Sequence, residues 1–100
     1  MTIGELIKDD RWSDYAAGLG EAGIDADDVA ACEVIHSDTS SMEGYGQVDI
    51  EIIFKQGDSF VAVVAGCDTT GWDCRASGDS KVCATEEEAR AWVKENGAHP

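Results

Sequence analysis

The stretch QVDIEIIFKQGDSFVAVVAG, Gln47 to Gly66, contains two β-strand patterns joined by a short turn. In its first half two sets of side chains alternate: Val48, Ile50, Ile52 and Phe54 against Asp49, Glu51 and Ile53. Such a period of two is typical of a strand with one buried face. Gly57 and Asp58 suit a tight reversal, and FVAVVAG then returns as a second apolar strand. The stretch predicts a β-hairpin.

The residues before the hairpin predict short helices and a further strand. Thr2 and Glu5 form a capping box for a helix over 3–10. Ser13 is a candidate cap for a second helix over 14–22, which Gly23 would end. ADDVAAC at 26–32 favours a short third helix, although the chain could run directly into the strand CEVIHSD. The segment SSMEGYG, residues 40–46, has the composition of a turn.

The residues after the hairpin predict more sheet and a closing helix. CRAS (74–77) and KVCA (81–84) read as short third and fourth strands around a GDS turn. Thr85 and Glu88 form another capping box, and EEEARAWVKEN reads as a helix that Gly97 ends. The sequence therefore predicts one α+β domain over residues 1–100, with N-terminal short helices, a four-stranded antiparallel meander sheet and a C-terminal helix.

Charge restricts the partners that this protein can have. Twenty-one Asp and Glu against seven Lys and Arg give a net charge of −14, of which residues 1–54 carry −11. Such a field repels nucleic acid and anionic membranes and attracts basic surfaces. We therefore expect no direct binding to nucleic acid or membranes, and we expect a basic partner, such as a protein built to hold nucleic acid.

The cysteines allow a metal or redox hypothesis. Cys32, Cys67, Cys74 and Cys83 lack the C-x-x-C spacing of structural zinc sites. The N-terminus has no signal-peptide pattern, so we expect a reducing cytoplasm and free thiols. We interpret CDTTGWDC, residues 67–74, as a structural connection and expect neither a metal nor a cofactor. A small thiol or zinc protein built on these four cysteines is kept as an alternative.

Signatures of catalysis are absent from the sequence. The two histidines are His36 and His99, and no serine lies in a G-x-S-x-G elbow. There is also no glycine-rich phosphate loop and no calcium loop. Carboxylates are so numerous that any two could be taken for a general acid and base. We therefore expect a protein that is not an enzyme and has no catalytic residues.

The acidic residues supply the candidate binding site. Asp49 and Glu51 lie about 6.6–6.8 Å apart on the outer face of the best strand, and like charges placed in this way do not help folding. An ordinary solvated face explains them equally well. The functional interpretation joins them to other carboxylates in one acidic surface. Its predicted members are Asp25, Asp27, Asp28, Glu33, Asp38, Asp49 and Glu51.

In size and charge the chain resembles the small acidic anti-defence proteins of phages and mobile elements, the anti-CRISPR and anti-restriction proteins of the DNA-mimic type. The GCDTTGWDC segment also resembles segments of small phage proteins. The resemblance implies a stoichiometric inhibitor, monomeric and active in the host bacterial cytoplasm, whose carboxylates replace DNA phosphates on a Cascade-type CRISPR effector. The alternative is an acidic phage accessory module that binds a protein without mimicry.

Overall fold

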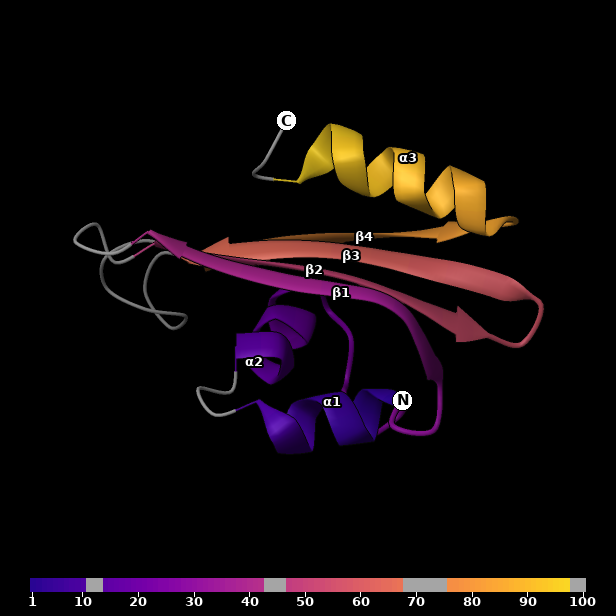
Figure 1. Cartoon of the computed structure of the whole chain (residues 1–100), viewed down its shortest axis with the longest axis horizontal. Helices are drawn as coiled ribbons and strands as arrows, with labels where there is room; N and C mark the ends of the chain where they lie inside the picture. The colour runs from indigo at the N-terminus through magenta and orange to yellow at the C-terminus, as the bar shows by residue number, and fades with distance from the viewer. Residues whose placement is uncertain (11–13, 43–46, 68–75, 98–100) are drawn as a thin grey trace.

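The computed structural model describes residues 1–10, 14–42, 47–67 and 76–97. These residues form three helices and four strands, with two helices before the strands and one after them (Figure 1). The elements are α1 (Ile3–Asp9), α2 (Asp14–Glu21), β1 (Glu33–Met42), β2 (Gln47–Gln56), β3 (Ser59–Cys67), β4 (Ala76–Cys83) and α3 (Glu86–Asn96). The predicted α+β class is confirmed, with short helices first, a four-stranded antiparallel sheet and a closing helix.

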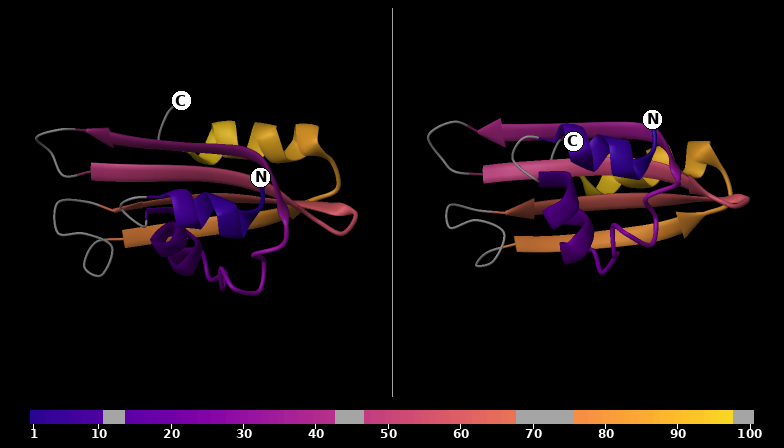
Figure 2. Two further views of the ribbon diagram at one scale, coloured as in Figure 1. Left: turned by 60° about the horizontal axis from the view of Figure 1, so that its bottom comes forward. Right: turned by 90° about the horizontal axis from the view of Figure 1, so that it is seen from below.

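The four strands form a meander in which chain neighbours are also sheet neighbours, in the order β1-β2-β3-β4. All pairs are antiparallel (Figure 2). The predicted hairpin is confirmed: Gln56 pairs with Ser59, which leaves Gly57 and Asp58 as its loop. Gly57 has φ +62°, a left-handed conformation that glycine adopts without a Cβ clash.

Helices cover both faces of the sheet, so the molecule has three layers (Figure 1). On one face Ile50, Ile52 and Phe54 pack with residues of α1 and α2. On the other, Ile53 and Ala62 pack with residues of α3. The predicted alternation in β2 is therefore present. The side chains of Asp49, Glu51 and Ile53, however, do not form a fully solvated outer face, because α3 covers part of it. Ile53 is fully buried beneath α3.

The helix α1 begins with the predicted capping box. The N–H of Glu5 donates to Oγ1 of Thr2 at 3.2 Å, and the N–H of Thr2 donates to Oε1 of Glu5 at 2.9 Å. Ser13, the predicted cap of α2, lies outside the described residues. The N–H of Tyr15 in the first turn of α2 donates to Oδ2 of Asp10 at 2.7 Å. As predicted, Gly23 follows α2, with φ +81°.

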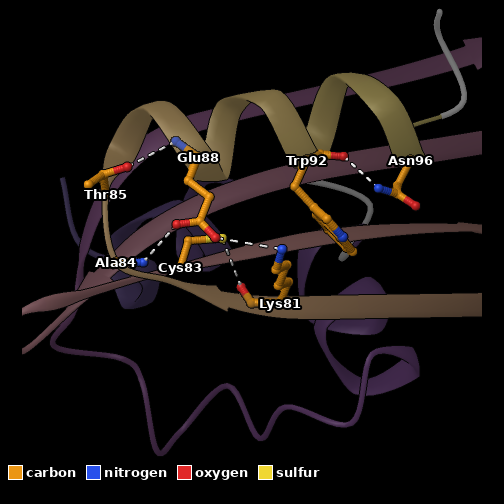
Figure 3. A network of polar contacts seen from close by, with 7 residues as sticks. All are labelled: Lys81, Cys83, Ala84, Thr85, Glu88, Trp92 and Asn96. Atoms are coloured by element: carbon orange, nitrogen blue, oxygen red, sulfur yellow. Dashed lines mark hydrogen bonds and ion pairs between the residues drawn. The ribbon is translucent and has the colours of Figure 1, made fainter.

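The helix α3 has a cap that differs slightly from the predicted box (Figure 3). The N–H of Glu88 donates to Oγ1 of Thr85 at 3.1 Å, as expected. The Glu88 carboxylate accepts from the N–H of Ala84 at 3.4 Å and lies 3.6 Å from Nζ of Lys81. This carboxylate thus ties the start of α3 to the end of β4. Gly97 caps the other end through an N–H bond to the carbonyl of Val93.

Removal of the Thr85 hydroxyl should destabilise the protein measurably. We expect Thr85→Ala to lower the free energy of unfolding by about 1 kcal/mol, because it leaves a first-turn N–H without its acceptor. Urea denaturation followed by circular dichroism measures the change. Thr85→Ser is the control, since it keeps the hydroxyl. An equal loss in the serine variant would contradict a capping role.

Three local predictions are wrong. Residues 26–31 form turns and not a helix, because the carbonyls of Ala30 and Cys32 accept from the N–H groups of Gly4 and Ile3. Residues 40–42 continue β1 and do not begin a turn, since they pair with β2. Residues 78–80 lie inside β4 and pair with β3, so the two short strands predicted there are a single one.

Candidate functional site

Three of the seven carboxylates predicted for the binding surface lie together on the sheet face that α3 covers. Asp38 pairs with Glu51 across β1 and β2, and Asp49 precedes Glu51 by two residues on the same face. Glu51 is not freely solvated: its side chain is 17% exposed, and Oε2 lies 3.3 Å from Nε2 of His36. Asp38 is exposed at the β1 edge.

The other four predicted carboxylates lie elsewhere. Asp25, Asp27 and Asp28 belong to the 22–32 connection, which packs through Ile24 and Val29 on the same core as α1 and α2. They are therefore on the opposite side of the sheet from Glu51. Glu33 begins β1 and pairs with Lys55. It precedes Asp38 by five residues, so the two acidic residues are about 17 Å apart along the strand. The structure thus does not gather the predicted residues into one surface.

An open groove of about 360 Å³ separates part of α3 from the sheet. The sheet contributes His36, Asp38, Glu51 and Ile53, and the helix contributes Arg90, Val93 and Lys94. Two carboxylates therefore share this groove with two permanent cations. Within the groove the cations offset the carboxylates in part, although Nε of Arg90 already lies 2.9 Å from Oε2 of Glu86.

The opposite side of the molecule is also acidic. Residues 1–32 contain eight carboxylates and two basic residues. We call the outer surface of α1, α2 and the 22–32 connection the acidic layer. Its carboxylates belong to Glu5, Asp9, Asp10, Asp14, Glu21, Asp25, Asp27 and Asp28. All of these except Asp10 and Asp14, which are half-buried, are exposed.

The helical part of the acidic layer was missed by the sequence prediction, although a signal for it was present. Glu5 and Asp9 are four residues apart in α1, so they share a helix face. That face is opposite the one through which Ile3 and Leu6 enter the core. In α2, Asp14 and Glu21 are seven residues apart, which is two helical turns. Helical periodicity applied to the acidic residues would have placed these four outside the core.

Some carboxylates of the acidic layer also have structural roles. Asp10 accepts the N–H of Tyr15, and Oδ1 of Asp25 accepts the N–H of Asp27 at 3.0 Å. The hydrogen bonds from the Thr2 backbone and side chain hold the pKa of Glu5 below its usual value. Asp27 and Asp28 are exposed, so their carboxylates can reach a partner.

The negative field reaches the β1 edge. The pKa of the Tyr15 hydroxyl is raised, first by burial and then by the charges of Asp38, Asp10 and Asp14, against the lowering effect of its hydrogen bond to Ser37. Tyr15 thus links the acidic layer electrostatically to Asp38. Of the predicted residues on the α3 side, Asp38 is the one whose charge acts on Tyr15.

The described cysteines are not gathered into one site. Cys67 and Cys83 are buried and Cys32 is half-buried. Cys83 pairs with Phe60 of β3, and Phe60 precedes Cys67 by seven residues in that strand. The positions of Cys83 and Cys67 are therefore separated by about 23 Å along the strand. Among the described residues no group of three or more His, Cys, Asp and Glu could hold a metal ion. Cys74 and residues 68–73, interpreted above as a connection, lie outside the described residues.

The thiols should differ in reactivity. Burial raises the pKa of the Cys83 thiol, and the nearby Glu88 adds to the effect while Lys81 opposes it. We expect iodoacetamide to modify native Cys83 at least about tenfold more slowly than half-buried Cys32, because the reagent must wait for local opening. Peptide mapping by mass spectrometry measures each rate. The two rates should converge in urea, and equal native rates would contradict the burial of Cys83.

Comparisons of the chain with protein-family models, with curated proteins and with solved structures find no match. In the described part of the chain no helix has the length and apolar character needed to cross a membrane.

Proposed function

We propose that this protein is a non-enzymatic, stoichiometric inhibitor of a bacterial defence complex, of the anti-CRISPR type. In this proposal it acts in the host cytoplasm as a DNA mimic and occupies the Lys- and Arg-rich DNA-binding surface of a Cascade-type effector. The observation that supports it most is the acidic layer, whose eight carboxylates belong to described residues on one side of the sheet.

The charge density of the molecule is of the right order for mimicry. Its longest dimension is 40 Å, and its net charge is −14. Over that length B-DNA carries about 24 phosphates. The protein thus presents more than half of the linear charge density of DNA. Its exposed carboxylates are also the groups that arginine binds in a bidentate manner, as it binds phosphate.

The split of the predicted surface favours one side of the molecule for the proposed contact. The three aspartates of the 22–32 connection lie in the acidic layer, whereas Asp38 and Glu51 share a groove with Arg90 and Lys94. At the acidic layer a basic partner would meet exposed carboxylates and Lys8, whereas at the groove it would also meet Arg90 and Lys94. We therefore place the binding surface on α1, α2 and the 22–32 connection, with Asp49 and Glu51 outside it.

A competition titration tests the proposal. Fluorescence anisotropy follows labelled target DNA on a purified Cascade-type complex while this protein is added. We expect release of the DNA at a stoichiometric ratio, an affinity that falls as salt rises, and no binding of the protein to the DNA alone. Target DNA that stays bound while the protein saturates the complex would contradict mimicry, and so would an affinity independent of salt.

A further inference from the structure

Among the described residues the strand β4 forms one edge of the sheet (Figure 2). It pairs with β3 alone among the described strands. The N–H of Ser80 donates to Oδ1 of its neighbour Asp79 at 2.8 Å, so it points away from β3. In an antiparallel strand alternate residues point the same way, and the backbone groups of Gly78 and Val82 therefore also face outward. Such an edge is a template for another strand.

The other edge of the sheet, β1, is less suited to pairing. The N–H of Val34 near its start donates to the carbonyl of Met1 at 2.8 Å. The ionised side chains that the sequence of β1 contains are carboxylates, those of Glu33 and Asp38. A second acidic chain would meet them in repulsion. By contrast β4 contains one acid, Asp79, and one base, Lys81, within an otherwise uncharged strand.

We propose that two copies of this chain pair through β4, antiparallel, about a two-fold axis at Ser80. This register follows from the order of the charges. With Ser80 opposite Ser80 of the second copy, Asp79 lies opposite Lys81, and the symmetry repeats this pair on the other side of the axis. Gly78 lies opposite Val82. The outward-facing residues then become the hydrogen-bonded pairs that an antiparallel ladder requires.

The side chains at this edge fit such a pairing. Asp79 and Lys81 form non-hydrogen-bonded pairs, in which the Cα atoms are only about 4.5 Å apart and the side chains are closest. The side chain of Lys81 is 48% exposed, and its ion pair with Glu88, at 3.6 Å, is also exposed, so Nζ can turn from Glu88 to Asp79 of the second copy. Val82 is 66% exposed, a large value for an apolar residue, and pairing would place it beside a glycine.

The geometry of the pair also extends the acidic layer. A two-fold axis between antiparallel neighbours stands perpendicular to the sheet, so the helical layers of both copies lie on the same side. The dimer would thus present two acidic layers to one partner surface. Each copy has a net charge of −14, and this long-range repulsion opposes association. We therefore expect a reversible dimer held by the local complementarity of β4.

Charge-swapped variants in sedimentation velocity, with reducing agent present, test the dimer. Wild type should shift from monomer to dimer with concentration. Asp79→Lys and Lys81→Asp should each weaken the dimer by about tenfold or more, because two attractive cross-strand pairs become repulsive. An equal mixture of the two variants should regain the wild-type affinity. Lys94→Asp, which has the same charge change as Lys81→Asp but lies in α3, should dimerise almost as wild type does.

The direction in which one variant changes the dimer affinity distinguishes local pairing from a general effect of net charge. Asp79→Lys makes each copy less negative, so general repulsion predicts a stronger dimer, whereas pairing through β4 predicts a weaker one. Ser80→Pro removes an outward N–H that β3 does not use; it should keep the circular dichroism of the fold and abolish the dimer. A wild type that stays monomeric at every concentration, or a mixture no tighter than its components, would overturn the proposal.

Discussion

Neutralising the three aspartates of the 22–32 connection is expected to weaken binding to a basic DNA-binding complex by about tenfold, since exposed ion pairs contribute about 0.2–1 kcal/mol each and three of them about 0.6–3 kcal/mol. The variant combines Asp25→Asn, Asp27→Asn and Asp28→Asn. These side chains are exposed, and Asn can still accept the Asp27 N–H at position 25. Isothermal titration against the Cascade-type complex measures the affinity, and its decline with salt should become shallower because fewer charges are paired.

The matched control removes the same charge from the other side of the sheet. Asp38→Asn, Asp49→Asn and Glu51→Gln together also make the net charge of −14 less negative by three. They change the face that Arg90 and Lys94 share. We expect this variant to bind within about threefold of wild type, as its effect is limited to the long-range field. If the two variants lose affinity equally, net charge and not the acidic layer decides binding.

The strand and helix elements were predictable where one local pattern dominates. The period of two in β2, the glycine turn at Gly57 and the capping residues Thr2 and Thr85 all act within a few residues. The failures involve contacts between distant segments. The 26–31 turns depend on N–H groups donated by the start of α1, and residues 78–80 are held in a strand by β3 in spite of their turn-like composition.

The candidate site could be predicted only in part for the same reason. Alternation in β2 correctly places Asp49 and Glu51 on one face, and antiparallel register adds Asp38. Sequence alone does not reveal that α3 crosses this face with Arg90 and Lys94, or that the 22–32 connection packs on the other side of the sheet. Both facts concern which layer covers which face. Counting charges in the sequence therefore shows that the protein is acidic, whereas the position of the acidic layer becomes known only from the fold.

Truncating Phe54 is expected to have the largest effect on stability of any change considered. Its side chain is 1% exposed, and the residue lies between Val34 and Val61 in the core shared with α1 and α2. We expect Phe54→Ala to lower the free energy of unfolding by about 3–5 kcal/mol, because it removes apolar contacts and leaves a cavity. Small domains have only about 5–15 kcal/mol in total. Urea denaturation with linear extrapolation measures the loss.

Phe60→Ala provides the comparison, because the two phenylalanines differ in their surroundings and not in chemistry. Phe60 packs at the margin of the α3 core, where Nζ of Lys55 lies 5.9 Å from its ring centroid, and it is partly exposed. Its removal opens no closed cavity, and we expect a loss of only about 1 kcal/mol. The net charge of −14 already opposes the compact state, and this repulsion is strongest at low salt. Phe54→Ala should therefore also unfold at a low salt concentration at which Phe60→Ala stays folded. Equal losses would mean that the α1 and α2 layer does not seal the core around Phe54, and the acidic layer would then lose the packed base that positions it.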